Sequence, residues 1–336
     1  MKRLLSILLI LCLTFSVSGV SEGRGTPELN ENTDELDALI EEEQFLTDED
    51  SVVFDPEEEL MLDEFTLNTA FDTLDNTRNI LLLGLDSRSS SISGRTDTII
   101  LLNIDIENRK IKMVSFLRDT YVEIPGKKNN RLNSAYVFGG FDLLADTLYK
   151  NFGVRADAYV AVNLAGLVDV IDQLGGIDVD IPENKIARVN AVIYWYNIQV
   201  LKLKNERDGF LTKGGYQHLN GKQAESWARY RYSESDFERS ARQRQLMELL
   251  YKKICQMSAG EMISFALNNI GLVKTNISIS DLKNLVPAVL ALKDSEISGI
   301  QIPLRGKYKS EKISGMNVLV PDRQANVSEL RKFLAE

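Results

Sequence analysis

The sequence of 336 residues contains only two cysteines and a single histidine, His218. Cys12 and Cys255 can build neither a disulfide framework nor a cysteine metal cluster, and one histidine cannot supply a clustered histidine site. The chain also lacks a G-x-x-x-x-G-K-[ST] loop for nucleotide phosphates and a helix-turn-helix with a basic recognition helix. These absences argue against zinc chemistry, against a P-loop enzyme and against direct binding of DNA.

Positive charge is missing from one long segment, since the chain has seventeen acidic residues and no lysine or arginine between Glu28 and Glu64. The net charge of the whole chain is -10, but residues 78–336 alone carry about +7. A block of like charge with few aromatic residues buries too little apolar surface to offset its ordering entropy. Residues 21–77 are therefore predicted to be an acidic, mostly disordered linker, with an acidic helical layer around "LDALIEEEQFL" as the alternative.

The chain begins with Met1-Lys2-Arg3 and the apolar run "LLSILLILCLTFSVSGV", which is typical of an export segment. In length this run lies between the apolar region of a cleaved signal peptide, about 7–15 residues, and a membrane span of about 20. Residues 1–20 are therefore predicted to be either a signal peptide, cleaved near Val17-Ser18-Gly19, or a membrane anchor. Because the positive flank stays inside, either reading places residues 21–336 at the extracytoplasmic face of the bacterial cytoplasmic membrane.

Residues 78–336 alternate between strand and helix patterns. Apolar runs at 79–86, 96–105 and 109–119 predict buried strands, with a hairpin turn at 105–109 between the last two. The helices "FDLLADTLYKNFG" and "NLAGLVDVIDQLGG" are each followed by a strand, "ADAYVAVN" and "IDVDIP". A helix from Ser280, strands near Ile300 and Val318, and a terminal helix from about Asp322 complete the chain. This pattern predicts one α/β domain, a mixed β-sheet with helices packed on both faces.

Charged clusters stand at the ends of the first three predicted strands: Asp86 after the first, Arg95 and Asp97 at the start of the second, and Arg118-Asp119 after the third. In open α/β sheets, ligands bind in the crevice beyond the carboxyl ends of the strands. One loop separates Asp86 from Asp97, so the two carboxylates can meet. Two carboxylates beside arginines suit a hard ion such as Mg²⁺ or Mn²⁺, and a structural salt bridge between aspartate and arginine is the alternative.

Five arginines gather in the stretch "WARYRYSESDFERSARQRQ" at 227–245. A helix is predicted over "GKQAESWARY" and is expected to end near Arg229. If the chain is then extended through Tyr232, Arg229 and Arg231 lie on one face. Asp236 is a good N-cap for the next predicted helix, "FERSARQRQLMELLYKKI".

The start of this second helix is predicted to bind an anion. Arg239, Arg242 and Gln243 stand at i, i+3 and i+4 near the helix N-terminus, where backbone N–H groups and the helix dipole favour negative charge. Several planar guanidinium forks around a helix N-terminus are what a phosphate or pyrophosphate needs. For Arg242 the choice between this face and a solvated outer face stays open, and Arg244 is predicted to lie on the surface.

Together these motifs resemble a known family. The order and spacing of "NILLLGLDSR…GRTDTIILLNID…KIKMVSFLRDTYVEIPG…RLNSAYVFGG" and "GGYQHLNGKQAESWARYRY…DFERSARQRQ" are similar to those of the LytR-CpsA-Psr (LCP) family of cell-envelope proteins, along nearly all of residues 78–336. The resemblance implies a single LCP-type domain. Two features depart from the familiar pattern: Arg131 stands where lysine is common, and the segment between Arg231 and Asp236 is shorter.

The resemblance also implies roles for particular residues. Asp86 and Asp97 would coordinate magnesium and, with Arg118, would be the catalytic residues. The residues implied around the lipid-linked pyrophosphate are Arg95, Arg118, Arg229, Arg231, Arg239 and Gln243, with Asp236 holding the arginines.

The implied activity is that of an exported, Mg-dependent glycopolymer–peptidoglycan phosphotransferase. It would transfer a glycopolymer, such as a teichoic acid or capsule polymer, from an undecaprenyl-pyrophosphate carrier to peptidoglycan through a phosphodiester link. Its partners would be the polyprenyl-pyrophosphate-linked glycan, the peptidoglycan acceptor and the membrane, through the N-terminal segment, and no nucleic acid. Two alternatives use the same residues: a hydrolase of the lipid pyrophosphate, and a non-catalytic envelope regulator that binds polyprenyl phosphate.

A lipid carrier with many isoprene units needs a long apolar groove. The run "AVIYWYNIQVL" at 191–201 is rich in aromatic and branched residues. It is predicted either to line such a groove or to form an ordinary core strand.

Overall fold

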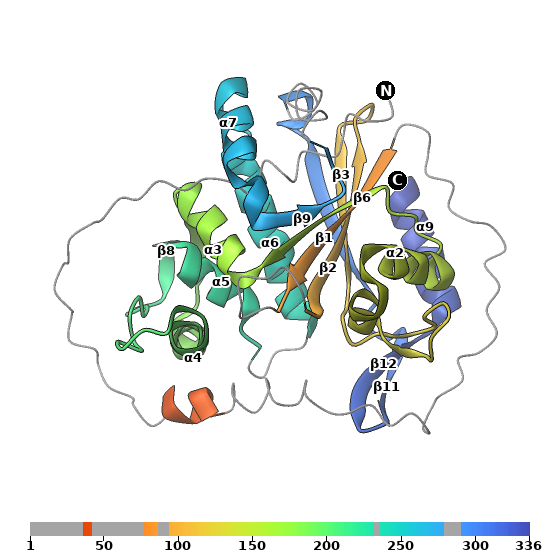
Figure 1. The fold of residues 1–336 in the computed structure, drawn as a ribbon, viewed down its shortest axis with the longest axis horizontal. Helices are drawn as coiled ribbons and strands as arrows, with labels where there is room; N and C mark the ends of the chain where they lie inside the picture. The colour runs from red at the N-terminus through yellow and green to blue at the C-terminus, as the bar shows by residue number, and fades with distance from the viewer. Residues whose placement is uncertain (1–35, 42–76, 87–93, 232–235, 279–289) are drawn as a thin grey trace.

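A six-stranded mixed sheet forms the centre of the fold (Figure 1). The computed structural model describes residues 36–41, 77–86, 94–231, 236–278 and 290–336. The strand order is β10-β3-β2-β1-β6-β9. Strand β1 is antiparallel to β2 and parallel to β6, β2 is antiparallel to β3, β3 is parallel to β10, and β6 is antiparallel to β9. The strands span β1 Thr77–Leu85, β2 Thr96–Asp105, β3 Lys110–Phe116, β6 Ala158–Asn163, β9 Val273–Thr275 and β10 Glu296–Ile302.

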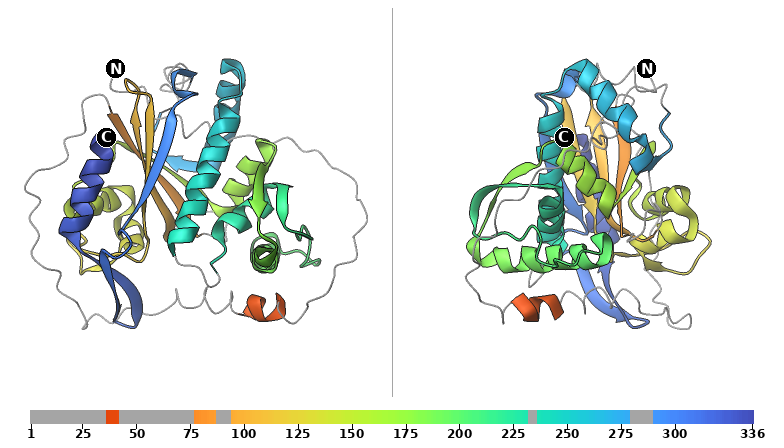
Figure 2. Two further views of the ribbon diagram at one scale, coloured as in Figure 1. Left: turned by 180° about the vertical axis from the view of Figure 1, so that it is seen from behind. Right: turned by 60° about the vertical axis from the view of Figure 1, so that its left-hand side comes forward.

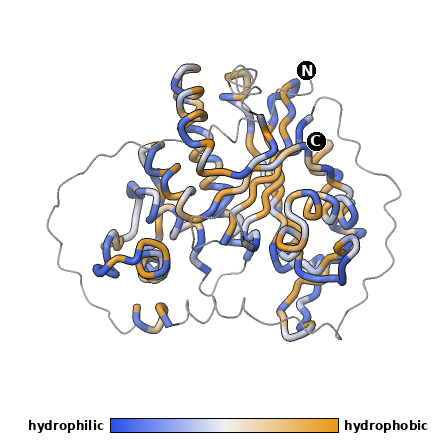
Figure 3. Tube along the Cα trace, in the orientation of Figure 1, coloured by the Kyte–Doolittle hydropathy of each residue, from blue (hydrophilic) through white to orange (hydrophobic). Residues whose placement is uncertain are grey.

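Helices cover both faces of this sheet (Figures 1 and 2). On one face lie α2 Leu132–Phe152 and α9 Arg323–Ala335, and on the other lie α3 Leu164–Gln173, α4 Ile186–Tyr196, α5 Gly221–Arg229, α6 Asp236–Ile254 and α7 Ala259–Asn269. Because successive strand residues point to opposite faces, Ile80 and Leu82 of β1 join one core while Leu81 and Leu83 join the other. Apolar residues accordingly concentrate along the central strands (Figure 3). The predicted mixed α/β fold is confirmed.

Smaller elements extend this core. Three two-stranded sheets pair β4 Tyr121–Val122 with β5 Asn130–Arg131, β7 Ile177–Ile181 with β8 Gly215–Leu219, and β11 Tyr308–Ile313 with β12 Met316–Pro321. Two 3-10 helices span Glu183–Lys185 and Ile270–Leu272, and a π-helix spans Asn197–Leu201. Since β10 belongs to the central sheet, the C-terminal part of the chain is part of the same fold.

Several local predictions are confirmed. The turn after Asp105 joins β2 to β3 as a hairpin, and α2 ends at Gly153, whose left-handed φ of 74° closes the helix. Helix α5 begins after Asn220, whose side chain caps it, and ends at Arg229. The helix predicted from Ser280 falls largely on residues 279–289, which lie outside the described part of the chain.

The prediction for residues 191–201 is wrong, because this run is helical and forms the end of α4 and the π-helix that follows it. Burial is continuous over residues 189–193, as in a helix that is covered on several sides, rather than alternating as in a half-buried strand. Aromatic and β-branched residues favour strands only weakly, and packing against neighbouring elements overrides that preference.

One piece of the acidic segment contacts the domain. Residues 36–41 form a short helix, Leu39 is buried, and the Trp195 Nε1–H of α4 donates a hydrogen bond to the Ile40 carbonyl at 2.9 Å. Here the helical alternative holds, and the other residues of the predicted linker up to residue 76 lie outside the described part.

Helix α5 approaches α3 so closely that Gly221 has no room for a side chain. A Cβ at Gly221 would lie 2.1 Å from the Val168 carbonyl oxygen, whereas a Cβ at Gly260, at the start of α7, would meet nothing within 4 Å. Gly221→Ala is therefore expected to lower the free energy of unfolding by roughly 1–3 kcal/mol, the range typical of overpacking. Gly260→Ala, the control, is expected to raise it by up to about 1 kcal/mol. Urea unfolding of the two variants checks this, and equal effects would contradict the close packing.

Candidate active site

The edge of the central sheet brings the charged strand ends together. Because β1, β2 and β3 are antiparallel in succession, the end of β1, the start of β2 and the end of β3 meet at one edge. Asp86 follows β1, Asp97 is the second residue of β2, and Arg118 follows β3. The Asp86 N–H donates to the Arg95 carbonyl at 3.0 Å, which closes the two ends of the intervening loop.

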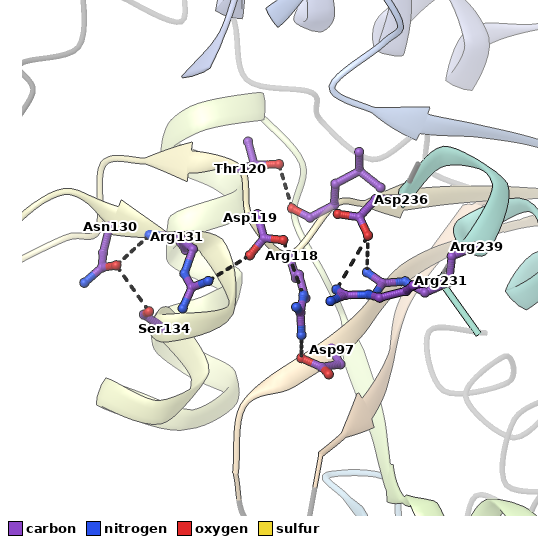
Figure 4. A network of polar contacts seen from close by, with 11 residues as sticks. Asp97, Arg118, Asp119, Thr120, Asn130, Arg131, Ser134, Arg231, Asp236 and Arg239 are labelled. Atoms are coloured by element: carbon purple, nitrogen blue, oxygen red, sulfur yellow. Dashed lines mark hydrogen bonds and ion pairs between the residues drawn. The ribbon is translucent and has the colours of Figure 1, made fainter. Parts of the chain in front are cut away.

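Arg118 is the centre of an ion-pair network at this edge (Figure 4). Its Nη1 donates to Asp97 Oδ1 at 2.6 Å, and its Nε lies 3.4 Å from Asp119 Oδ2. The second oxygen of Asp119 accepts from Arg131 Nη1 at 3.1 Å. The Arg118 side chain is only 4% exposed, so its charge is compensated by carboxylates rather than by water.

Helices α5 and α6 add a second group of charges. Asp236, at the start of α6, lies 2.9 Å from Arg239 Nη2 and 3.5 Å from Arg231 Nη2. Figure 4 shows these side chains beside Arg118 and Asp97. Arg118, Arg231 and Arg239, which were predicted to surround one pyrophosphate, therefore lie together beside Asp97 and Asp236, and residues 232–235 lie outside the described part.

The pKa shifts reflect the density of positive charge. Burial alone would raise the pKa of Asp97, but Arg118, Arg239 and Arg231 together lower it to about 2. Burial raises and the same three arginines lower the pKa of Asp236, with a net decrease. Burial, helped by the positive charges of Arg231 and Arg118, lowers the pKa of Arg239 to about 10. Guanidinium groups that repel one another in this way favour the binding of an anion.

An apolar cavity opens onto this cluster. About 1010 Å³ of space not filled by atoms, part of it open solvent, lies between the sheet and helices α3, α5 and α6. The mouth is formed by the polar lining residues Asp86, Asp97, Arg229, Arg239 and Gln243, and Glu225 is a further acidic lining residue. The wall includes Leu82, Val160, Leu167, Leu246, Met247 and Leu250. Residues 191–201, predicted as a possible groove, are not among the lining residues.

Two arginines of the predicted cluster have other positions. Arg242 donates from Nε to the Trp227 carbonyl at 3.0 Å and stacks 3.7 Å from the centre of the Tyr230 ring, so it ties α6 to the C-terminus of α5. Arg244 was predicted to lie on the surface, and this is wrong. Its Nη1 donates to Ser115 Oγ of β3 at 2.8 Å, and burial lowers its pKa. Helix periodicity gives no information about which outer face a neighbouring sheet will cover.

Sequence reasoning missed Glu225. Its side chain is 2% exposed, lines the cavity and lies 3.0 Å from Arg229 Nε as an i, i+4 ion pair. The spacing between Glu225 and Arg229 was visible in the sequence, but the direction of both side chains depends on where α5 packs.

The acidic residues of the site provide only some of the ligands that a hard cation such as Mg²⁺ needs. Among the described residues, no group of three or more histidines, cysteines, aspartates or glutamates could hold a metal ion. Asp86 and Asp97 both line the mouth, Asp97 is ionised, and one of its oxygens is already used by Arg118. Two carboxylates match Mg²⁺, which commonly takes one or two protein ligands and completes its shell with substrate phosphates and water.

The site combines an apolar cavity with several paired guanidinium groups at its mouth. This combination defines a class of proteins that can bind an amphiphile, a ligand with an apolar tail and an anionic head group. The family follows from sequence comparison. The model of the LytR_cpsA_psr family matches residues 45–333, and the chain belongs to this family. The resemblance recognised in the motifs is thus confirmed.

Two named relatives are similar to this chain over most of their length. The chain is 34% identical over 264 residues to the polyisoprenyl-teichoic acid–peptidoglycan teichoic acid transferase TagU of Bacillus cereus, covering 76% of this chain and 78% of the relative. It is 30% identical over 265 residues to the regulatory protein MsrR of Staphylococcus aureus, covering 78% and 76%.

Solved structures have the same fold. TagT bound to LIIa-WTA matches with a TM-score of 0.61 and 25% identity over 81% of this chain and 95% of that chain. YwtF (TagT) with bound octaprenyl pyrophosphate lipid matches with a TM-score of 0.58 and 23% identity over 80% and 95%. In the described ranges no helix combines the length and apolarity needed to cross a membrane, and residues 1–20 lie outside those ranges.

The low pKa of Asp97 predicts a pH dependence of stability. An unfolded aspartate has a pKa of about 3.9, so a folded value of about 2 stabilises the fold above pH about 4. This contribution is lost as the pH falls from about 4 to about 2. In Asp97→Asn the unfolding free energy is therefore expected to fall less steeply over that window, with a smaller slope left by Asp236. Urea unfolding at several pH values measures this, and parallel profiles for the two proteins would refute the assignment.

Proposed function

We propose that this protein is an exported phosphotransferase of the cell envelope. It transfers a glycopolymer from an undecaprenyl-pyrophosphate carrier to peptidoglycan through a phosphodiester link. The observation that carries the proposal is the apolar cavity that opens directly onto the arginine cluster. The similarity to TagU, a teichoic acid transferase, supports the reaction class. Residues 1–20 would export the chain or anchor it at the outer face of the cytoplasmic membrane.

The two parts of such a substrate match the two parts of the site. Isoprene units would enter the cavity between the sheet and α6, where each buried CH₂ contributes about 0.8 kcal/mol. The pyrophosphate would stay at the mouth, beside Arg118, Arg229 and Arg239. Guanidinium forks can donate two parallel hydrogen bonds to a phosphate, which fixes its orientation as well as its charge.

The reaction proposed for this site is an in-line displacement. The acceptor hydroxyl oxygen forms a bond to the sugar-linked phosphorus, the bond from that phosphorus to the bridging oxygen breaks, and the electron pair leaves with the lipid phosphate. The hydroxyl proton passes to the departing lipid phosphate or to water. Arg118 and Arg239 would stabilise the negative charge that develops on this leaving group. Asp97, with a pKa of about 2, is a poor acceptor for the hydroxyl proton, so its role is to hold charge and position.

Charge balance supports a metal cofactor. The paired groups at the mouth nearly cancel: Arg118, Arg131, Arg229, Arg231 and Arg239 face Asp97, Asp119, Glu225 and Asp236. A lipid-linked pyrophosphate brings two negative charges, which this set alone does not neutralise. Asp86 and Asp97 would hold Mg²⁺ or Mn²⁺, which when bound would neutralise phosphate charge.

The proposal is tested by incubating the protein with a polyprenyl-pyrophosphate-linked saccharide, Mg²⁺ and peptidoglycan. Saccharide joined covalently to the glycan is expected, together with free lipid phosphate, and EDTA is expected to stop turnover. Free phosphorylated saccharide would instead indicate a lipid-pyrophosphate hydrolase. Binding without turnover would indicate a non-catalytic regulator, and activity that persists in EDTA would contradict the metal assignment.

The cavity assignment predicts an effect that depends on the length of the lipid. Leu167 of α3 is only partly buried and lines the cavity, so Leu167→Trp would fill it without touching the charged mouth. With a long polyprenyl carrier, kcat/KM is expected to fall more than about tenfold, because the lost tail contacts are worth at least about 1.4 kcal/mol. A carrier with two or three isoprene units serves as the control and should lose less. Equal losses for both carriers would exclude the cavity as the lipid site.

A further inference from the structure

Glu225 places a carboxylate in the wall of the apolar cavity. It lies in α5, one turn before Arg229, and its side chain is 2% exposed. A buried carboxylate without a partner costs several kcal/mol, so the protein must gain something by keeping it there. Its charge also acts on the interior of the domain: burial, and after it the Glu225 carboxylate, raises the pKa of Tyr196 in α4.

This carboxylate forms an ion pair with Arg229, and its Oε2 accepts a hydrogen bond from Ser226 Oγ at 3.4 Å. Glu225 Oε1 lies 3.0 Å from Arg229 Nε, and Arg229 keeps 27% of its side chain exposed. Both residues line the cavity, with the carboxylate buried and part of the guanidinium exposed.

The other arginines of the cluster form ion pairs with aspartates. Arg118 is held by Asp97 and Asp119, and Arg231 and Arg239 are held by Asp236. Those aspartates stand at strand ends or at the start of α6. Arg229 differs, because its partner Glu225 is only 2% exposed, whereas the three aspartates are 17–30% exposed.

We propose that Glu225 is a positioning residue that orders Arg229 for the phosphate nearest the lipid, an inference that rests on the proposed function. A free arginine side chain carries about 2 kcal/mol of rotamer entropy, which must be lost when it binds an anion. The ion pair with Glu225 removes much of this freedom before substrate arrives. The negative charge of Glu225 also offsets one positive charge at the mouth and so weakens the initial attraction for the pyrophosphate.

The ordering of Arg229 and the weakened attraction for the pyrophosphate can be separated by a substitution that keeps the size of the side chain at position 225. Glu225→Gln keeps the volume but removes the charge, so kcat is expected to fall about tenfold while KM stays unchanged or falls. Because an unfolded fraction lowers the apparent kcat at constant KM, kcat is normalised to the folded fraction measured by circular dichroism. In an Arg229→Ala background, Glu225→Gln is expected to change kcat less than about twofold, because a residue that acts through Arg229 has nothing left to position.

Glu248→Gln is the matched control. Glu248 forms an exposed i, i+4 ion pair with Lys252 on α6, and removing its charge is expected to leave both kinetic constants unchanged. The proposal is overturned if Glu225→Gln has wild-type kinetics, if it raises KM at constant kcat, or if its loss is fully additive with that of Arg229→Ala.

A readout without turnover separates this inference from the proposed function. In arginine-¹⁵N-labelled protein, the Arg229 Nε–H signal, assigned with Arg229→Lys, is expected to be sharp in the wild type and broadened in Glu225→Gln. If the wild type shows no transfer but this difference is seen, the proposed function fails while the positioning of Arg229 stands. An unchanged Arg229 signal means that Glu225 does not order it, whatever the reaction.

Discussion

The ion pair between Arg118 and Asp97 is the contact on which the rest of the site depends. It joins the end of β3 to the start of β2, and through Asp119 it continues to Arg131 at the start of α2. A guanidinium as buried as that of Arg118 would be strongly destabilising without a carboxylate partner. The sheet edge can therefore collect positive charge only as a paired network, and this pairing lowers the pKa of Asp97 to about 2 although burial acts to raise it.

Helix α6 connects this network to the cavity. Arg239 and Gln243 stand at its mouth, while Leu246 and Leu250, further along the same helix, form part of its wall. Two other arginines of α6 attach this helix to its neighbours. Arg242 binds the C-terminal carbonyls of α5, and Arg244 binds β3. Since one rigid element supplies both the charged mouth and the apolar wall, a change that shifts α6 alters the binding of the head group and of the lipid tail together.

The sequence predicts the polar half of the site better than the apolar half. Asp86, Asp97 and Arg118 stand out because each follows or opens an apolar run, and strands of alternating direction bring such ends to one edge. The face of α6 that carries Arg239 and Gln243 follows from helical spacing. Arg244 could not be placed in this way, since β3 and β10, which cover it, are distant in sequence. Residues 191–201 misled because strand preference is weak and packing against α5 prevails.

By itself the sequence determined the α/β class, the order of most elements, the family and the charged residues at the sheet edge, because these depend on local periodicity and on linked motifs. Only the tertiary structure decided where the cavity lies, that Glu225 stands in its wall, and which carboxylate holds which arginine. The physical reason is that charge pairing and burial act over a few ångströms of space. Residues as far apart in the chain as Asp97, Arg118 and Arg239 reach that separation only when the sheet and helices have packed.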